Sequence, residues 1–77
     1  MALSDPYFIT LSSPAIAADI IDRMKPVAQG ELWAEIRQED ADQFKLQFGS
    51  KDGLAYFVYC PTFSEARELG QKWGGLR

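Results

Sequence analysis

The amino-acid sequence predicts a two-layer α+β domain with the element order β-α-β-β-β-α. Three observations lead to this fold class. Residues 54–60 form a short, uncharged run of aromatic and β-branched residues, as in a strand buried on both faces at the middle of a small sheet. Residues 31–38 and 43–48 alternate apolar and polar residues with the period of strands. Residues 13–25 and 62–73 begin with helix-capping residues and repeat apolar residues with the period of helices.

The N-terminal part of the chain is expected to contain an arm and a strand. Residues 1–5 show no apolar periodicity and are interpreted as a flexible arm, and the β-prone residues 7–11 follow Pro6. This strand could pair beside residues 31–38 or beside residues 54–60, and the pattern leaves both pairings open. The sheet is therefore expected to be antiparallel, with three or four strands and both helices on one face.

The first helix has a clear start and a clear end. Ser12 or Ser13 can cap its free amides, Pro14 suits the first helical position, and Pro26 ends it near residues 24–25. The apolar face is expected to consist of Ile16, Ala17, Ile20, Ile21 and Met24.

The two alternating strands are expected to pair with each other and with residues 54–60 in an antiparallel meander, because only short loops join them. The side chains expected to face the helices are Leu32, Ala34, Ile36, Phe44, Leu46 and Phe48.

The last helix carries a capping box formed by Thr62 and Glu65, and Gly74-Gly75 is expected to end it. Gly70 interrupts the helix at a cost of about 1 kcal/mol relative to alanine, which indicates a close approach to the first helix or to the sheet. The inward stripe is expected to be Phe63, Ala66, Leu69 and Trp73.

Composition excludes several functions. The 77 residues suffice for one domain, contain no histidine, and include one cysteine, Cys60, which is expected to be a reduced core thiol. Without a visible nucleophile–base pair or ligand set, we expect neither enzymatic activity nor a metal or cofactor. The first residues lack the features of a signal peptide and no run is long enough to span a membrane, so a cytoplasmic protein is expected.

The sheet face away from the helices is the predicted binding surface. It should carry Trp33, Glu35, Arg37 and Lys45, a composition typical of protein-binding hot spots. The last strand adds either Tyr56 and Val58 or Phe57 and Tyr59, and Tyr56 is the predicted contact. The alternatives are that Trp33 only forms a cross-strand pair, or that the N-terminal arm covers it.

A predicted secondary contact lies in the connection between the two alternating strands, where Glu39, Asp40 and Asp42 could face a basic partner. Their spacing does not match a calcium-binding loop, and a solvated turn is the structural alternative. If this group, Glu35 and the helix residues Asp19 and Asp22 share one side, the surface could mimic nucleic acid.

From Ser13 to Gly74 the order α-β-β-β-α resembles that of the double-stranded-RNA-binding domain. That family places a lysine-rich run at the start of its last helix, where this chain has residues 62–68, of which only Ala66 and Arg67 are compatible. The resemblance therefore implies a shared topology without RNA binding.

In size, acidic charge and histidine-free composition the chain also resembles the small inhibitors that phages make against host systems, including anti-CRISPR proteins. This resemblance implies a protein that occludes a host protein complex in the host-cell cytoplasm. The sequence thus predicts a non-enzymatic inhibitor or regulator that docks a larger protein. The net charge of −3 disfavours direct nucleic-acid binding, which remains an alternative for the open sheet face together with a homodimer interface.

Overall fold

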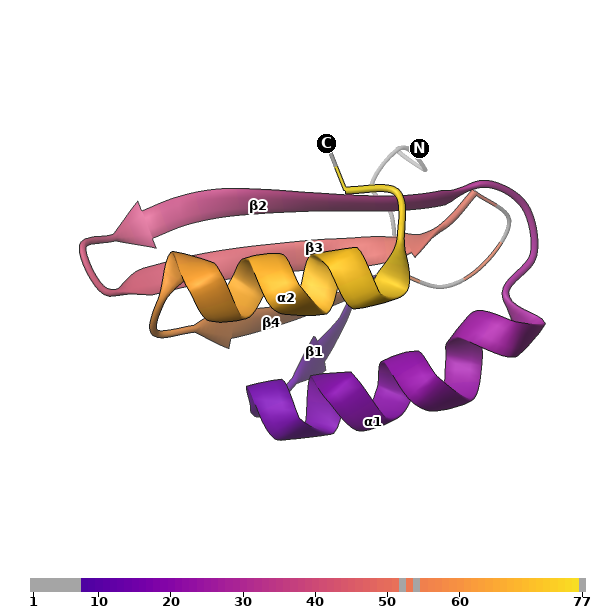
Figure 1. Ribbon diagram of the computed structural model, residues 1–77, viewed down its shortest axis with the longest axis horizontal. Coiled ribbons are helices and arrows are strands. Elements are labelled where there is room, and N and C mark those ends of the chain that lie inside the picture. The colour runs from indigo at the N-terminus through magenta and orange to yellow at the C-terminus, as the bar shows by residue number, and fades with distance from the viewer. Residues whose placement is uncertain (1–7, 52, 54, 77) are drawn as a thin grey trace, which may run out of the picture.

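The computed structural model describes residues 8–51, 53 and 55–76 and confirms the predicted α+β class and element order (Figure 1). The arm predicted for residues 1–5, Tyr7 of the first strand and Leu54 of the last strand lie outside the described residues. The elements are β1 (Phe8–Leu11), α1 (Pro14–Met24), the 3-10 helix η1 (Lys25–Val27), β2 (Leu32–Asp40), β3 (Gln43–Ser50), β4 (Ala55–Cys60) and α2 (Phe63–Trp73).

The four strands form one sheet in the order β1-β4-β3-β2. Strands β2, β3 and β4 form the predicted antiparallel meander, and β4 lies inside the sheet as expected. The prediction of an all-antiparallel sheet is wrong for β1, which pairs with β4 in parallel. The reason is the crossover through α1, which returns the chain to the end of the sheet at which β1 begins, so that β2 runs in the same direction as β1 (Figure 1). Strand β4 follows after two antiparallel turns and therefore runs parallel to both.

Both helices begin where the capping residues predict. The Ser13 hydroxyl accepts a hydrogen bond of 3.3 Å from the amide of Ile16, and the Thr62 hydroxyl accepts one of 3.1 Å from the amide of Glu65. Each bond satisfies an amide in a first helical turn that has no partner within the helix. The caps therefore fix the points at which the chain leaves β1 and β4 to cross the sheet.

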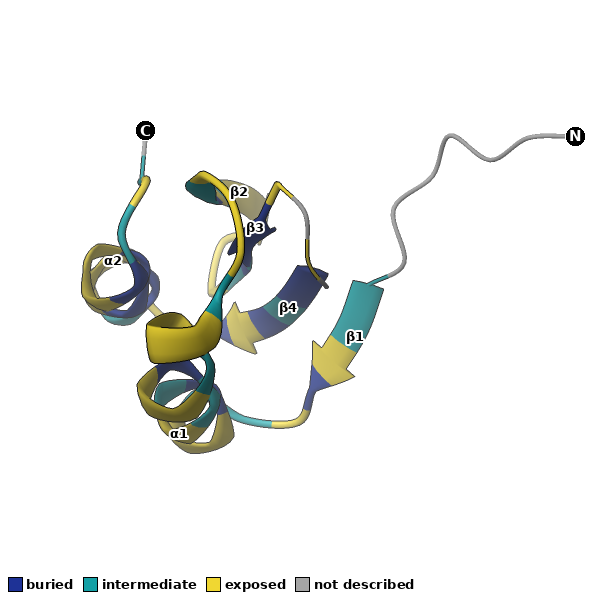
Figure 2. Ribbon diagram, turned by 90° about the vertical axis from the view of Figure 1, so that its right-hand side faces the viewer, coloured by how far each residue is buried: buried dark blue, intermediate teal, exposed yellow. Residues whose placement is uncertain are grey.

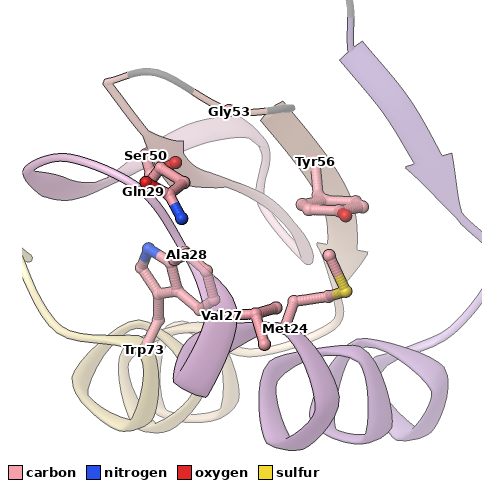
Figure 3. Close-up of a pocket in the computed structure, with 8 residues that line it drawn as sticks. All are labelled: Met24, Val27, Ala28, Gln29, Ser50, Gly53, Tyr56 and Trp73. Carbon is pink, nitrogen blue, oxygen red and sulfur yellow. The ribbon is translucent and has the colours of Figure 1, made fainter.

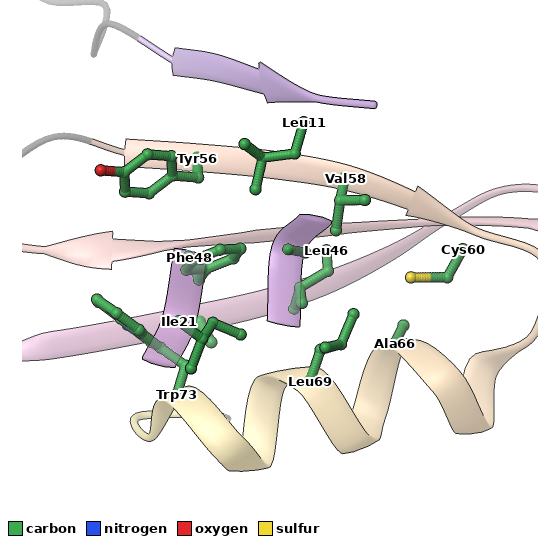
Figure 4. Packing of buried hydrophobic residues seen from close by; sticks show 12 residues of the cluster. Leu11, Ile21, Leu46, Phe48, Tyr56, Val58, Cys60, Ala66, Leu69 and Trp73 are labelled. Carbon is green, nitrogen blue, oxygen red and sulfur yellow. The ribbon is translucent and has the colours of Figure 1, made fainter. Parts of the chain in front are cut away.

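The two helices cover one face of the sheet and leave the other face uncovered (Figure 2). Between the layers lies a continuous apolar core to which the strands and both helices contribute (Figure 4). Its largest fully buried side chains are Trp73, Phe48, Ile21, Leu46, Val58 and Cys60.

Two residues of the predicted helix faces lie farther out than expected. Ile16 is 44% exposed, and Ala17 and Ile21 occupy the centre of the buried face of α1. Phe63 is 50% exposed at the first turn of α2, where its ring contacts Phe44 edge-on with centroids 6.0 Å apart. Both residues stand in the first turn of their helix.

Trp73 anchors the end of α2 to the sheet. Its ring lies 5.2 Å from that of Phe48, which in turn stacks on Tyr56 with centroids 5.4 Å apart. Its indole Nε1 donates a buried hydrogen bond of 2.9 Å to the carbonyl oxygen of Gly49 in β3. The indole thus satisfies its one polar group inside an otherwise apolar site.

After α2 the chain turns back along the outer edge of β2. Gly74 and Gly75 adopt positive φ angles of 105° and 75°, which glycine accommodates without strain. The carbonyl of Gly75 accepts a hydrogen bond of 3.1 Å from the amide of Ala34, and Leu76 forms a parallel bridge with Ala34. This tail covers the first part of an edge strand that would otherwise leave backbone groups unpaired.

The tail also explains Gly70. A Cβ at this position would lie 3.0 Å from Leu76 Cδ1 and 3.4 Å from Leu46 Cδ1. The atoms nearest to this position therefore belong to the sheet, as one of the two predicted close approaches requires, and to the tail.

Candidate binding surface on the open face of the sheet

The strand register determines which side chains share the uncovered face. Residues that pair across the sheet point to the same side, and alternate residues point to opposite sides. We define the open face as the residues that occupy the side of the sheet away from the helices: Phe8, Thr10, Trp33, Glu35, Arg37, Lys45, Gln47, Gly49, Ala55, Phe57 and Tyr59.

One transverse row of the open face has bulky residues at both ends and small residues between them. Phe8 of β1 pairs with Ala55, Ala55 with Gly49, and Gly49 with Trp33 of β2. Because neither inner residue fills the space above the backbone, the outer rings lean inward and meet edge to face, with centroids 6.3 Å apart. Two edge strands are thereby joined by side chains across the middle of the sheet.

The aromatic contacts continue along β4. The Phe57 ring lies 6.1 Å from that of Phe8 and 5.7 Å from that of Tyr59, both in edge-to-face geometry. We call Phe8, Trp33, Phe57 and Tyr59 the aromatic belt. Edge-to-face pairs of this kind are each worth about 0.5–1.5 kcal/mol beyond the area that they bury.

Two cations lie beside the aromatic belt. Arg37 of β2 is directly opposite Lys45 of β3, which is directly opposite Tyr59 of β4. The ammonium of Lys45 lies 4.5 Å from the centroid of Phe57 and 6.0 Å from that of Tyr59, so it is positioned by cation–π contacts. We call Tyr59, Lys45 and Arg37 the cationic row.

The structure places four predicted contact residues together on the open face: Trp33, Glu35, Arg37 and Lys45. The prediction that Tyr56 is a surface contact is wrong, because Tyr56 lies on the helix side of β4 and is only 6% exposed. The alternative side, with Phe57 and Tyr59, faces outward. Tyr59 is 38% exposed, so β4 is buried on its helix face and only partly covered on the other.

Phe8 is a surface residue of this site that the sequence pattern did not predict. Its role depends on the parallel pairing of β1 with β4, which places it in the same row as Trp33. The alternation of Phe8 with Ile9, which packs against the core, was a weak signal for an outward side chain.

The acidic residues do not form one surface. Glu39, Asp40 and Asp42 are exposed at the tip of the β2–β3 hairpin, where Asp40 Oδ1 accepts a hydrogen bond of 2.7 Å from the amide of Ala41. The residues Asp19 and Asp22 lie in the helix layer and form ion pairs with Arg23 and Lys72 at 3.2 Å and 3.1 Å.

Glu35 belongs to the open face, which lies on the far side of the sheet from α1. The acidic groups are therefore separated, and they do not form the single acidic surface that could mimic nucleic acid. Within the described ranges, no three His, Cys, Asp or Glu side chains are grouped so that they could hold a metal ion.

Tyr56 instead lines a small pocket in the helix layer (Figure 3). The pocket has a volume of ≈ 220 Å³ and lies between the end of α1, η1, the end of α2 and the β3–β4 connection. Its walls are Met24, Val27, Ala28, Gln29, Ser50, Gly53, Tyr56 and Trp73. It is smaller than the pockets of about 300–1,000 Å³ that usually enclose small-molecule ligands.

Cys60 is a buried free thiol, as predicted. Burial, together with the nearby negative charge of Glu65, raises the pKa of the Cys60 thiol to about 11. The reactive form of cysteine is the thiolate, so this environment makes the sulfur a weak nucleophile at neutral pH.

Among the residues that the structure describes, no helix has both the length and the apolar character that crossing a membrane requires. Comparisons with protein-family models, curated proteins and solved structures find no match for this chain.

Proposed function

We propose that this protein is a non-enzymatic binding protein that docks a larger protein through the open face of its sheet. The observation that carries the proposal is the aromatic belt beside the cationic row on a face that neither helix covers. Tryptophan, tyrosine and arginine dominate the binding energy of protein interfaces, and an apolar centre with a charged rim is their usual arrangement.

Such a protein would act by occupying a surface of its partner, as a stoichiometric inhibitor or regulator does. The resemblance to phage inhibitors of host systems, including anti-CRISPR proteins, adds a host complex as the target and the host cytoplasm as the location. These two finer points rest on the size, charge and composition of the chain.

The geometry favours a protein over a nucleic acid as the partner. Single-stranded nucleic acids bind sheet faces by stacking bases on aromatic rings, which needs an accessible ring face. The ammonium of Lys45 lies over the Phe57 ring, and the rings of the belt contact one another edge to face. A protein side chain can pack against such edges, whereas a base would first have to displace Lys45.

The test is affinity capture from a lysate of the source cells, with and without nuclease, followed by reconstitution with the purified captured protein. Wild type is compared with Trp33→Ala and with Glu68→Ala, a control at an exposed position on α2. The proposal predicts a nuclease-resistant complex that wild type and Glu68→Ala form and Trp33→Ala does not.

Two results would contradict the proposal. Capture that nuclease abolishes would indicate a nucleic-acid partner, and an unchanged complex with Trp33→Ala would place the interface elsewhere. Light scattering of the isolated protein is the parallel measurement, because a mass twice that of the monomer, lost in Trp33→Ala, would identify the open face as a homodimer interface.

A further inference from the structure

The cationic row has an unfavourable arrangement within the protein itself. Arg37 and Lys45 lie directly opposite each other on neighbouring strands, and like charges in that position destabilise a sheet. In the described part of the chain, ion pairs join Arg23 to Asp19 and Lys72 to Asp22, and neither involves the cationic row.

Among the described residues of the open face, Glu35 is the one carboxylate, and it does not neutralise the cationic row. It lies opposite Gln47, one pair away from Arg37 and Lys45, and forms no ion pair with either of them. Although the chain has a net charge of −3, the described residues of the open face therefore present two cations against one carboxylate.

The two cations are arranged to accept an external anion. Lys45 is half-buried and positioned over Phe57, while its ammonium keeps hydrogen-bond donors that the cation–π contact does not use. Arg37 is exposed, and its planar guanidinium can bind a carboxylate through two parallel hydrogen bonds. Positioning before binding lowers the entropic cost of the contact.

We infer that the open face binds an acidic segment of a partner protein, whose carboxylates lie at Arg37 and Lys45 while a neighbouring apolar side chain contacts Phe8, Trp33 and Phe57. This inference rests on the proposed docking function and specifies the chemistry of the partner. The evidence for it is charge complementarity: no ion pair within the described part of the chain involves the row, and one or two carboxylates of a partner would supply the missing charge.

An extended polyanion fits this surface less well than discrete carboxylates. A nucleic-acid backbone that extends past the cationic row would meet the carboxylate of Glu35 on the same face. In the other direction it would meet the exposed carboxylates of Glu39, Asp40 and Asp42 at the tip of the β2–β3 hairpin. A protein segment can place its charges at the row alone.

The test is selection of random peptides displayed on phage against the immobilised wild-type protein. Bound peptides are sequenced, synthesised and titrated against wild type and four variants. Arg37→Glu with Lys45→Glu reverses the row, Trp33→Ala removes a belt ring, and Arg23→Glu with Arg67→Glu is the control, which makes the same charge change at exposed helix positions. Arg37→Gln removes one charge of the row and is a milder change than the double reversal. Circular dichroism verifies that each variant is folded.

We expect the selected peptides to be enriched in aspartate and glutamate next to aromatic or aliphatic residues. The reversed row should weaken their binding on the order of 100-fold, and the control should leave it within about threefold. Binding should also weaken as salt concentration rises, because the contact is electrostatic.

The remaining outcomes separate this inference from the proposed function. Peptides that need Trp33 but carry no acidic residues would overturn the inference and leave docking through the open face standing. Peptides that ignore Trp33, or the absence of any enriched peptide, would overturn both. Binding of single-stranded poly(dT) that is lost on reversal of the row would overturn both in favour of nucleic acid.

Discussion

Phe8 and Trp33 lie on opposite edge strands of the sheet, with two strands between them, and their rings are nevertheless in contact. The contact exists because Gly49 and Ala55, the inner members of the same row, leave the space above the backbone free. This contact joins the side chains of the two edge strands, so the open face is one connected surface.

This contact predicts energetic coupling between the two edges. In a double-mutant cycle with Phe8→Leu and Trp33→Leu, we expect a coupling free energy of about 0.5–1.5 kcal/mol, measured by urea denaturation. Phe63→Leu with Trp33→Leu is the control, because Phe63 contacts Phe44 on the helix side of the sheet, and these two changes should be additive. Additive effects for the first pair would show that the rings do not support each other.

The cationic row should reduce the stability of the isolated protein. Arg37→Gln removes one of two like charges that face each other, and we expect the free energy of unfolding to rise by about 0.2–1 kcal/mol at low salt. The gain should shrink as salt screens the repulsion. Arg67→Gln, at an exposed position on α2, should change little. A loss of stability in Arg37→Gln would mean that this guanidinium has a favourable role within the fold.

The two tryptophans should contribute unequally to stability. Trp73→Phe removes the buried hydrogen bond to Gly49 and leaves a gap beside Phe48, so we expect the free energy of unfolding to fall by about 2 kcal/mol. Trp33→Phe, on the half-buried open face, should cost less than about 1 kcal/mol. Urea denaturation of both variants measures the difference, and the reverse order would contradict the assignment of Trp73 to the core.

The effect of Gly70→Ala on stability should depend on the side chain at Leu76. Gly70→Ala improves helix propensity by about 1 kcal/mol, but its Cβ would crowd the Leu76 side chain. We expect no net stabilisation in the wild-type background and a gain of about 1 kcal/mol in the Leu76→Ala background. Thermal or chemical denaturation of the four proteins measures the effect. An equal gain in both backgrounds would show that the tail does not rest on α2.

Cys60 should make stability depend on pH in the alkaline range. The pKa of its thiol is raised from 9.0 to about 11 in the folded protein, so the unfolded chain loses the proton first. The thiol's contribution to the free energy of unfolding is complete below pH 9 and is lost as the pH rises toward 11. The slope of this loss is at most about 1.4 kcal/mol per pH unit. The free energy of unfolding is measured against pH for wild type and for Cys60→Ala, and the difference between the two profiles removes the titration of tyrosine and lysine. A difference that does not change with pH would contradict the raised pKa of the thiol.

Apolar periodicity was sufficient to predict both α-helices and the strands β2 and β3, because each has one buried face and one exposed face. The short 3-10 helix η1 was not predicted. The uncharged apolar run of residues 54–60 predicted β4. It could not assign the faces of β4, since Tyr56, Phe57, Val58 and Tyr59 are all suitable for burial. The surface role of Phe8 followed from the strand order, which local sequence does not encode. The contact of Gly70 with Leu76 depended on how the chain turns back after Gly75.

The pairing of β1 with β4 has a consequence for how the molecule opens. Strand β1 is a four-residue edge element, and its pairing with β4 brings together segments that are far apart in the sequence. Elements of this kind commonly exchange their amide hydrogens through partial opening while the remaining core stays folded. When β1 detaches, Phe8 leaves the aromatic belt and Trp33 loses its ring partner. We therefore expect a bound partner to slow hydrogen exchange in β1 even where it touches only neighbouring strands.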